Sequence, residues 1–235
     1  MIATAGCSPD VLVLSGDLAN RGEVEAYARL RPTIEAALER FGAMLLVAPG
    51  NHDDVALLRE HLLGREPEPG PLDEVVRIGG LRLIGLDSSV PDADHGEISD
   101  AQLDALAGEL AQPAADGTVL VVHHPPIWST TPMSELVALR EPQRLAAVIR
   151  GRDVRLVLSG HTHRVSAGNL AGVPVWVSPS TSSHADVLVH DGFRGHAGGG
   201  FTRVDMLDDG DIVATFVPLI GRDEILYEAS PTTSS

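Results

Sequence analysis

Short apolar runs that end in glycine and polar residues recur along the chain and predict buried β-strands. Four of them are continuous and rich in Val and Leu, as expected of strands buried on both faces: 11–14, 44–47, 119–122 and 156–158. Apolar residues return with helical spacing in the stretches between them: 23–41, 55–63, 99–110 and 142–149. Ser99 is a predicted N-cap, and Pro32 is expected to mark the start of a second helix within the first stretch. This alternation predicts an α/β fold with a mainly parallel central sheet.

The C-terminal third has a different pattern, in which predicted strands follow one another without helices between them. These strands are 167–170, 173–177, 201–207 and 212–218. They predict a second, more antiparallel sheet packed on the first. The Gly- and His-rich stretch 183–200 is expected to be a loop. We expect one domain over residues 1–228 and a disordered tail over 229–235.

Composition narrows the class of protein. Hydrophobic residues make up 43% of the chain and charged residues 21%, which is ordinary for a domain with a packed core. The net charge of −16 argues against non-specific nucleic-acid binding and would repel an anionic substrate, unless a bound cation offsets the charge locally. Cys7 is the only cysteine, so neither an internal disulfide nor a cysteine zinc site is expected. The sequence shows no membrane-spanning apolar run and no secretory signal, so we expect a cytoplasmic protein.

Candidate metal ligands follow the four buried strands directly. In open α/β sheets, ligands bind beyond the carboxyl ends of the strands, so these side chains are expected to converge there. They are Asp17, Asn51, His123, His161 and His163. The neighbouring Gly16, Gly50 and Gly160 would allow the sharp turns that aim them inward. Any one of these residues alone is better explained as a turn or cap residue, but three histidines placed after buried strands are not.

The donor types indicate which metals would bind. Imidazole nitrogen together with carboxylate and amide oxygen suits Mn, Fe or Zn better than calcium. A carboxylate can bridge two ions about 3.5–4 Å apart, the spacing of two-metal hydrolytic centres. The sequence therefore predicts a pair of metal ions that clamps a phosphate group and activates water.

Four segments of the sequence together resemble the signature of a known family. The segments SGDLANRG, APGNHDD, VVHHPPI and SGHTH resemble, in order, the signature of the calcineurin-like metallophosphoesterases. LIGLDSSVP and HGEI are similar to the class III cyclic-nucleotide phosphodiesterases, especially those of mycobacteria. The resemblance covers about residues 8–220. It implies two packed mixed β-sheets flanked by helices in a four-layer sandwich, and a homodimer.

The resemblance also implies a role for each matching residue. Asp17 would bridge the two metals, and Asn51, His123 and His161 would complete the ligands of the second metal. His163 would bind the first metal, while His124 orients His123 or packs locally. His52 would bind phosphate or protonate the leaving oxygen, with Asp53 holding its tautomer. His95 resembles a substrate-facing histidine, although an exposed loop histidine explains it equally well. His184, His190 and His196 are too irregularly spaced for another metal site.

The sequence departs from the family pattern at two places. Asn20 stands where a second aspartate often follows the Gly-Asp motif. No Asp-x-His precedes Asp17, although the family carries that motif on a strand before Val11. A βα unit needs at least roughly 20–30 residues. We therefore expect either that Met1 is a misassigned start or that the sequence is a fragment whose N-terminal βα unit is missing. In-frame codons upstream should then encode the motif.

The sequence as a whole predicts a metal-dependent phosphodiesterase acting on small molecules. The expected substrates are 3′,5′- or 2′,3′-cyclic nucleotides, with hydroxide held by two metal ions attacking phosphorus. One alternative is a glycerophosphodiesterase or general phosphoesterase with the same metals. An alternative of another class is a non-catalytic phosphate- or nucleotide-binding module, if the Asp-x-His ligands are truly lacking. The sequence carries no P-loop, nucleophile elbow or dinucleotide fingerprint that would favour other chemistry.

Overall fold

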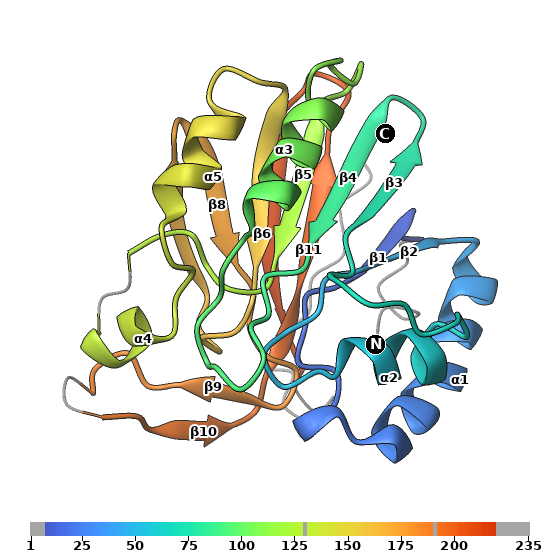
Figure 1. Cartoon of the computed structure of the whole chain (residues 1–235), viewed down its shortest axis with the longest axis vertical. Coiled ribbons are helices and arrows are strands. Elements are labelled where there is room, and N and C mark those ends of the chain that lie inside the picture. The colour runs from blue at the N-terminus through green and yellow to red at the C-terminus, as the bar shows by residue number, and fades with distance from the viewer. Residues whose placement is uncertain (1–7, 129–130, 190–191, 220–235) are drawn as a thin grey trace, which may run out of the picture.

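The centre of the molecule is a six-stranded mixed sheet in the order β3-β4-β5-β6-β8-β7. The computed structural model describes residues 8–128, 131–189 and 192–219 (Figure 1). Strands β4, β5, β6 and β8 run parallel, and antiparallel strands form the two edges. The strand bounds are β3 Glu74–Ile78, β4 Leu81–Leu86, β5 Thr118–Val122, β6 Val154–Ser159, β7 Ser166–Leu170 and β8 Val173–Val177. The predicted α/β fold with a mainly parallel sheet is confirmed.

One face of this sheet is covered by two helices, α3 (Asp100–Glu109) and α5 (Pro142–Ile149), which lie in front of it in Figure 1. Alternate residues of β5 explain the arrangement: Leu120 and Val122 pack with the helices, whereas Val119 and Val121 face the other way. The predicted N-cap of α3 is confirmed, because Ser99 and Gln102 form a reciprocal capping box.

The other face packs against a second β layer made of two strand pairs. One is the parallel pair of β1 (Val11–Leu14) and β2 (Met44–Val47), and the other is the antiparallel pair of β11 (Gly200–Met206) and β12 (Ile212–Pro218). Val11 and Val13 point into the core shared with the main sheet. Leu12 and Leu14 point to the opposite side, where they meet a helical layer.

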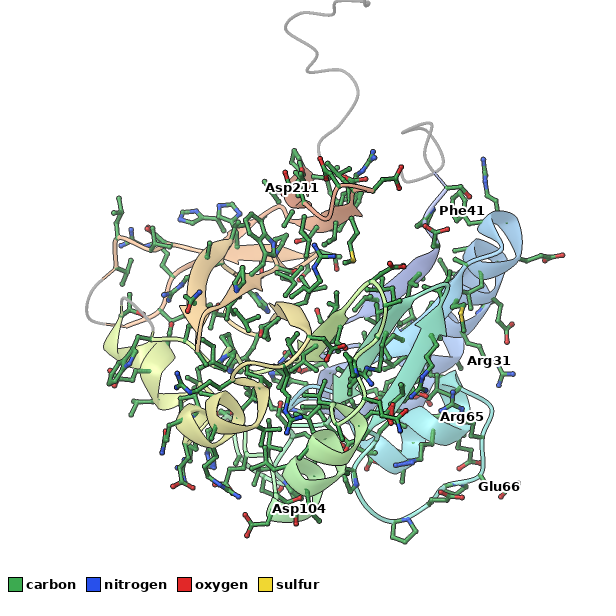
Figure 2. All side chains as sticks on the ribbon, turned by 90° about the horizontal axis from the view of Figure 1, so that it is seen from above. Arg31, Phe41, Arg65, Glu66, Asp104 and Asp211 are labelled. Carbon is green, nitrogen blue, oxygen red and sulfur yellow. The ribbon has the colours of Figure 1, made fainter. Side chains whose placement is uncertain are left out.

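This outer layer is led by α1 (Val24–Phe41), followed by α2 (Val55–Leu57) and a π-helical turn, Leu58–Leu62. The result is the predicted four-layer sandwich of helices, sheet, sheet and helices. The outer surfaces carry charged side chains, and Figure 2 shows Arg31, Glu66 and Asp104 pointing away from the body. Among the described residues, no helix is long and apolar enough to cross a bilayer.

The expected break at Pro32 is wrong, because α1 continues through it as one helix. A proline costs a helix one backbone hydrogen bond. Here Tyr27 and Ile34, on either side of it, are both buried in the core beneath β1 and β2, and this packing holds the helix together. The helix ends where Gly42 adopts φ 64° and its amide donates to the Leu38 carbonyl.

Two expectations for the C-terminal third are corrected. The hairpin β7–β8 does not belong to the second β layer, because β8 pairs in parallel with β6 and extends the main sheet. The predicted loop 183–200 contains two short paired strands, β9 (Ser183–Ala185) and β10 (Gly195–Ala197). The short helix α4 (Pro132–Leu136) was not predicted. The expected tail, 229–235, lies outside the described residues.

Candidate metal centre

The carboxyl ends of β1, β2, β5 and β6 meet at one edge of the molecule and are tied together by backbone contacts. The amide of Ala48, after β2, donates to the Leu14 carbonyl at 2.9 Å. The amide of Gly160, after β6, donates to the His123 carbonyl at 3.0 Å. His123 in turn donates through Nδ1 to the Ser15 carbonyl at 2.6 Å. Loops that lie far apart in the sequence therefore place their side chains in a common space.

Asp17, His123 and His161 form the centre of this space. His123 Nε2 lies 3.3 Å from Asp17 Oδ2 and 3.2 Å from His161 Nδ1. Because a carbonyl only accepts, the contact with Ser15 fixes the proton on Nδ1, and Nε2 is the atom that faces the other two side chains. Bonds of about 2.0–2.2 Å to one cation place neighbouring ligand atoms roughly 3.0–3.5 Å apart. The observed separations fit a shared metal ion.

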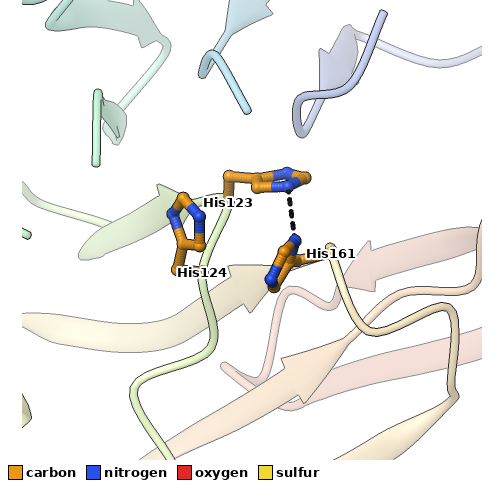
Figure 3. Close-up of side chains that lie close together, drawn as sticks. All are labelled: His123, His124 and His161. Carbon is orange, nitrogen blue, oxygen red and sulfur yellow. Dashed lines mark hydrogen bonds between the residues drawn. The ribbon is translucent and has the colours of Figure 1, made fainter. Parts of the chain in front are cut away.

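The three histidines of the site form a tight cluster (Figure 3). Ligand nitrogens of His123, His124 and His161 all lie within 4.8 Å of one another. The ring of His124 is fully buried, and its Nδ1 lies 2.8 Å from Ser88 Oγ. His124 Nε2 and His161 Nε2 are buried without a hydrogen-bond partner among the described residues. Buried ring nitrogens left unpaired are costly, so a cation that they could coordinate would resolve the arrangement.

The pKa shifts favour the neutral form of two of the three histidines in this cluster, His124 and His161. Burial alone would raise the pKa of Asp17, but the hydrogen bond and charge of His123 outweigh it and hold that pKa well below the usual range. Burial alone would lower the pKa of His123. The hydrogen bond and the charge of Asp17 outweigh this effect, so that the pKa of His123 is raised. Burial, then the charge of His123, lowers the pKa of His161 to about 3 and that of His124 to about 2. Two neutral imidazoles beside a carboxylate are ready ligands for a cation.

Asn51 and His163 lie at the border of this centre. Asn51 Oδ1 is buried and has no hydrogen-bond partner among the described residues, while its Nδ2 lies 3.5 Å from Asp94 Oδ1. This unpaired amide oxygen would be a suitable ligand atom for a metal ion. His163 Nδ1 lies 2.9 Å from the Ser183 hydroxyl, which orients the ring from strand β9. Burial is the largest cause of the lowered pKa of His163. The charge of Asp17 opposes this shift, and the charge of His123 adds to it. The assignment of these two residues as ligands stays a prediction.

Three of the candidate ligands have left-handed backbone conformations. Asp17 has φ 56°, His161 φ 66° and His163 φ 52°. Such conformations are uncommon for residues other than glycine and cluster at functional sites, where the surrounding structure holds them. Of the three glycines expected to form sharp turns, Gly16 does so with φ 90°. Gly50 and Gly160 instead allow close approach of the loops.

His52 and His95 each interact with one residue of this centre. The backbone amide of His52 donates to Asp17 Oδ1 at 3.1 Å, and its side chain is exposed. His95 lies 3.2 Å from Glu97 Oε1, and its charge acts on the buried His124. Both positions are compatible with the predicted contacts to substrate, which stay predictions.

Asp53 has partners other than the expected one. Its carboxylate accepts from the amides of Leu18, Ala19 and Gly50 and from the Tyr27 hydroxyl, at 2.9–3.1 Å. Among the described contacts none joins it to the His52 ring. Asp53 thus ties the loop that carries Asp17 to the loop that carries Asn51, and Tyr27 completes this clamp. The helical spacing of the sequence marks Tyr27 only as a core residue, so its role could not be predicted.

This clamp gives a first testable prediction. Tyr27 is 0% exposed, and its hydroxyl donates to Asp53 and accepts from the Asp54 amide at 3.1 Å. Tyr27→Phe keeps the ring but leaves a buried carboxylate and an amide each short of one partner. We expect the free energy of unfolding to fall by about 1–3 kcal/mol, measured by urea denaturation. An unchanged midpoint would show that water replaces the hydroxyl and that the clamp contributes little.

The fold and the donor set together define a metallohydrolase class, and comparison with known proteins agrees. Residues 4–165 match the model of the calcineurin-like phosphoesterases, and the chain belongs to this family. Members of the family use a dinuclear metal centre, and the histidine cluster fits a metal site.

Two relatives named as cyclic nucleotide phosphodiesterases are similar to most of this chain. The chain is 44% identical to a probable cyclic nucleotide phosphodiesterase of Rhodococcus erythropolis, over 93% of this chain and 73% of the relative. It is also 44% identical to a cAMP/cGMP dual specificity phosphodiesterase of Mycobacterium tuberculosis, over 97% of this chain and 72% of the relative. A dimetal phosphatase from Danio rerio has the same fold, with a TM-score of 0.53 and 15% identity over 80% of this chain and 81% of the other.

Proposed function

We propose that this protein hydrolyses phosphodiesters with the help of divalent or trivalent metal ions, and that its substrates are cyclic nucleotides. The observation that carries the proposal is the convergence of Asp17, His123 and His161 at 3.2–3.3 Å, with the orphaned acceptor of Asn51 beside them. The two relatives named as cyclic nucleotide phosphodiesterases, each 44% identical to this chain, support the choice of substrate.

The protein's own residues would contribute binding, orientation and proton transfer. Mn, Fe or Zn ions, when bound, would supply an activated water and neutralise charge on the phosphate oxygens. One ion would be held by Asp17, Asn51, His123 and His161. The other ion would have Asp17 and His163 as two of its ligands. The net charge of −16 repels an anionic phosphodiester, so the positive charge of the ions would be needed to draw it in.

His52 is the candidate proton donor. Its backbone amide donates to Asp17, which fixes the main chain at the edge of the centre, while its exposed ring remains available to substrate. A donor placed there could protonate the departing alkoxide and contribute roughly 10²–10⁴-fold to the rate. Asp53 would act on this step indirectly, by holding together the two loops that position Asp17 and Asn51.

The proposal is tested by activity and by metal content. We expect the protein supplied with Mn²⁺ to hydrolyse cyclic AMP and bis(p-nitrophenyl) phosphate. Chelation should abolish both activities, and fresh Mn²⁺ should restore them. His161→Ala should lose metal and activity, whereas His61→Ala, on the helical outer layer, serves as the matched control and should keep them. Inactivity with Mn²⁺, Fe²⁺ and Zn²⁺ alike would count against a hydrolase.

The alternatives give different results in the same assays. A glycerophosphodiesterase would show a higher kcat/KM on glycerophosphodiesters than on cyclic AMP. A non-catalytic module would bind metal or nucleotide without turnover. Metal analysis per chain therefore has to accompany the kinetics.

A further inference from the structure

Arg164 is a buried cation for which the described part of the chain shows no counter-ion. It follows His163 directly and is only 6% exposed. Among the described residues no carboxylate lies within ion-pair distance of its guanidinium, although the chain holds 33 acidic residues against 17 basic ones. Its Nε is buried and has no hydrogen-bond partner there. Burial lowers the pKa of Arg164 below its usual value. Buried charges in proteins are normally paired, so this position calls for an anion.

Arg82 shows how the same protein satisfies a buried arginine. It is 4% exposed, and its guanidinium lies 3.0–3.1 Å from both carboxylate oxygens of Asp153. Its other nitrogens donate to Thr118 Oγ1 and to the carbonyls of Glu109 and Gln112. Among the described residues, Arg164 therefore lacks the carboxylate partner that Arg82 has.

Two described hydrogen bonds connect Arg164 to Ser134 through Thr131. Arg164 donates to Thr131 Oγ1 at 3.0 Å, and Thr131 Oγ1 donates to Ser134 Oγ at 3.0 Å. The Ser134 hydroxyl thus accepts within this chain of contacts and keeps its own proton to donate. For that proton the described residues show no acceptor.

Arg164 and Ser134 line the same small pocket. Thr162 and Ser166 add two more hydroxyl-bearing residues, and apolar side chains such as Ile127 and Val177 form the rest. No carboxylate is among its described lining residues. The pocket therefore offers a positive charge and hydroxyl donors on an otherwise apolar wall, as expected of a receptor for an anion.

The size of the pocket limits what can enter. Its volume is about 110 Å³, far below the roughly 300–1,000 Å³ that encloses a drug-sized ligand. It is several times the roughly 30 Å³ that one water occupies in the liquid. A single oxyanion group fits this volume, whereas a whole nucleotide does not.

We propose that this pocket is an anion site, distinct from the metal centre, that binds one phosphate-type oxyanion between Arg164 and Ser134. The site adjoins the metal-binding loops, because Thr162 stands between His161 and His163 and Pro125 follows His124. The anion would supply the missing partner of Arg164 and so stabilise the loop that presents both histidines. It could be free phosphate or a second anionic group of a bound substrate.

Thermal unfolding of the full chain with inorganic phosphate tests the site. Phosphate also binds metal ions, so wild type is compared with Arg164→Met and His161→Ala. A ligand at a hundredfold its Kd raises the Tm of a protein of this size by about 5–10 °C. We expect His161→Ala to keep a shift of this kind and Arg164→Met to lose it. Without phosphate, Arg164→Met should unfold a few degrees above wild type, because an apolar side chain relieves the unpaired charge.

Two further variants keep the test decisive if Arg164→Met fails to fold. Ser134→Ala should reduce the phosphate shift while Arg164 remains, and Arg164→Lys should retain part of it. The matched contrast is Arg82→Met, which breaks a buried ion pair and should lower the Tm with or without phosphate. Equal phosphate shifts in wild type, Arg164→Met, Arg164→Lys and Ser134→Ala would overturn the proposal. These measurements need no hydrolysis, so the anion site and the proposed function can fail independently.

Kinetics distinguish the two sources of the anion. If the substrate supplies it, Arg164→Met should raise KM several-fold for a phosphodiester that carries a second phosphate group, but not for bis(p-nitrophenyl) phosphate. If the anion is free phosphate, both KM values should stay the same and only the phosphate-dependent stability should change.

Discussion

Asp17→Asn is expected to lower kcat/KM for cyclic AMP roughly a thousandfold, because it removes a negative charge at the proposed reaction centre without changing the shape of the side chain. Asp17 Oδ1 accepts from the His52 amide at 3.1 Å, and Oδ2 faces His123 Nε2 at 3.3 Å. An asparagine that keeps the first contact turns its NH₂ group toward His123, where a cation should bind. An amide also cannot bridge two metal ions as a carboxylate does. Asparagine tolerates the left-handed backbone of this position, so the main chain should be preserved.

The measurement combines metal analysis with steady-state kinetics on Mn²⁺-loaded protein. The variant should bind fewer metal ions per chain and should lose kcat more than KM is changed. Asp104→Asn is the matched control, because this carboxylate points outward from α3 (Figure 2) and the substitution should change neither quantity. Full activity of Asp17→Asn at normal metal content would show that Asp17 is not a metal ligand and would contradict the proposed mechanism.

The convergence of the candidate ligands was predictable from local sequence, because each of them follows a strand marked by a run of Val and Leu. The expected burial on both faces holds for β5 and nearly so for β6, whereas β1 is only partly buried. The carboxyl ends of β1, β2, β5 and β6 meet in the structure as the rule for parallel strands requires. Alternate residues of those runs pack on opposite faces. The four-layer order itself was expected from the family resemblance and not from these runs.

Other features depend on packing between distant segments and were missed for that reason. Strand β8 pairs with β6 and not with β11, and the sequence of β8 alone does not predict which partner it takes. The continuity of α1 through Pro32 depends on burial against the second β layer. The partners of Asp53 come from two loops and from Tyr27, 26 residues away in the sequence. Arg164 has no sequence signal, since only its described surroundings, which hold no carboxylate partner, mark it as unusual.

Gly50→Ala is expected to lower kcat/KM at least a hundredfold by forcing apart the loops that follow β1 and β2. A Cβ atom at Gly50 would stand 2.2 Å from Asp17 Oδ1, 2.5 Å from the Asp17 backbone nitrogen and 2.8 Å from His123 Cε1. A side chain could turn away, but a backbone nitrogen that is part of a tied loop cannot. Both candidate ligands would therefore be displaced, and a misplacement of about 1 Å at a reaction centre can cost roughly 10²-fold.

Gly50→Ala should also reduce metal affinity and lower the free energy of unfolding by about 1–3 kcal/mol, as overpacking does. Titration with Mn²⁺ and urea denaturation measure the two effects. The matched control is Gly108→Ala in α3, where an added Cβ meets nothing within 4 Å. That substitution should leave metal binding unchanged and stabilise the helix by roughly 0.5–1 kcal/mol. If Gly50→Ala binds Mn²⁺ as wild type does, the close contact between these loops is not what positions Asp17 and His123.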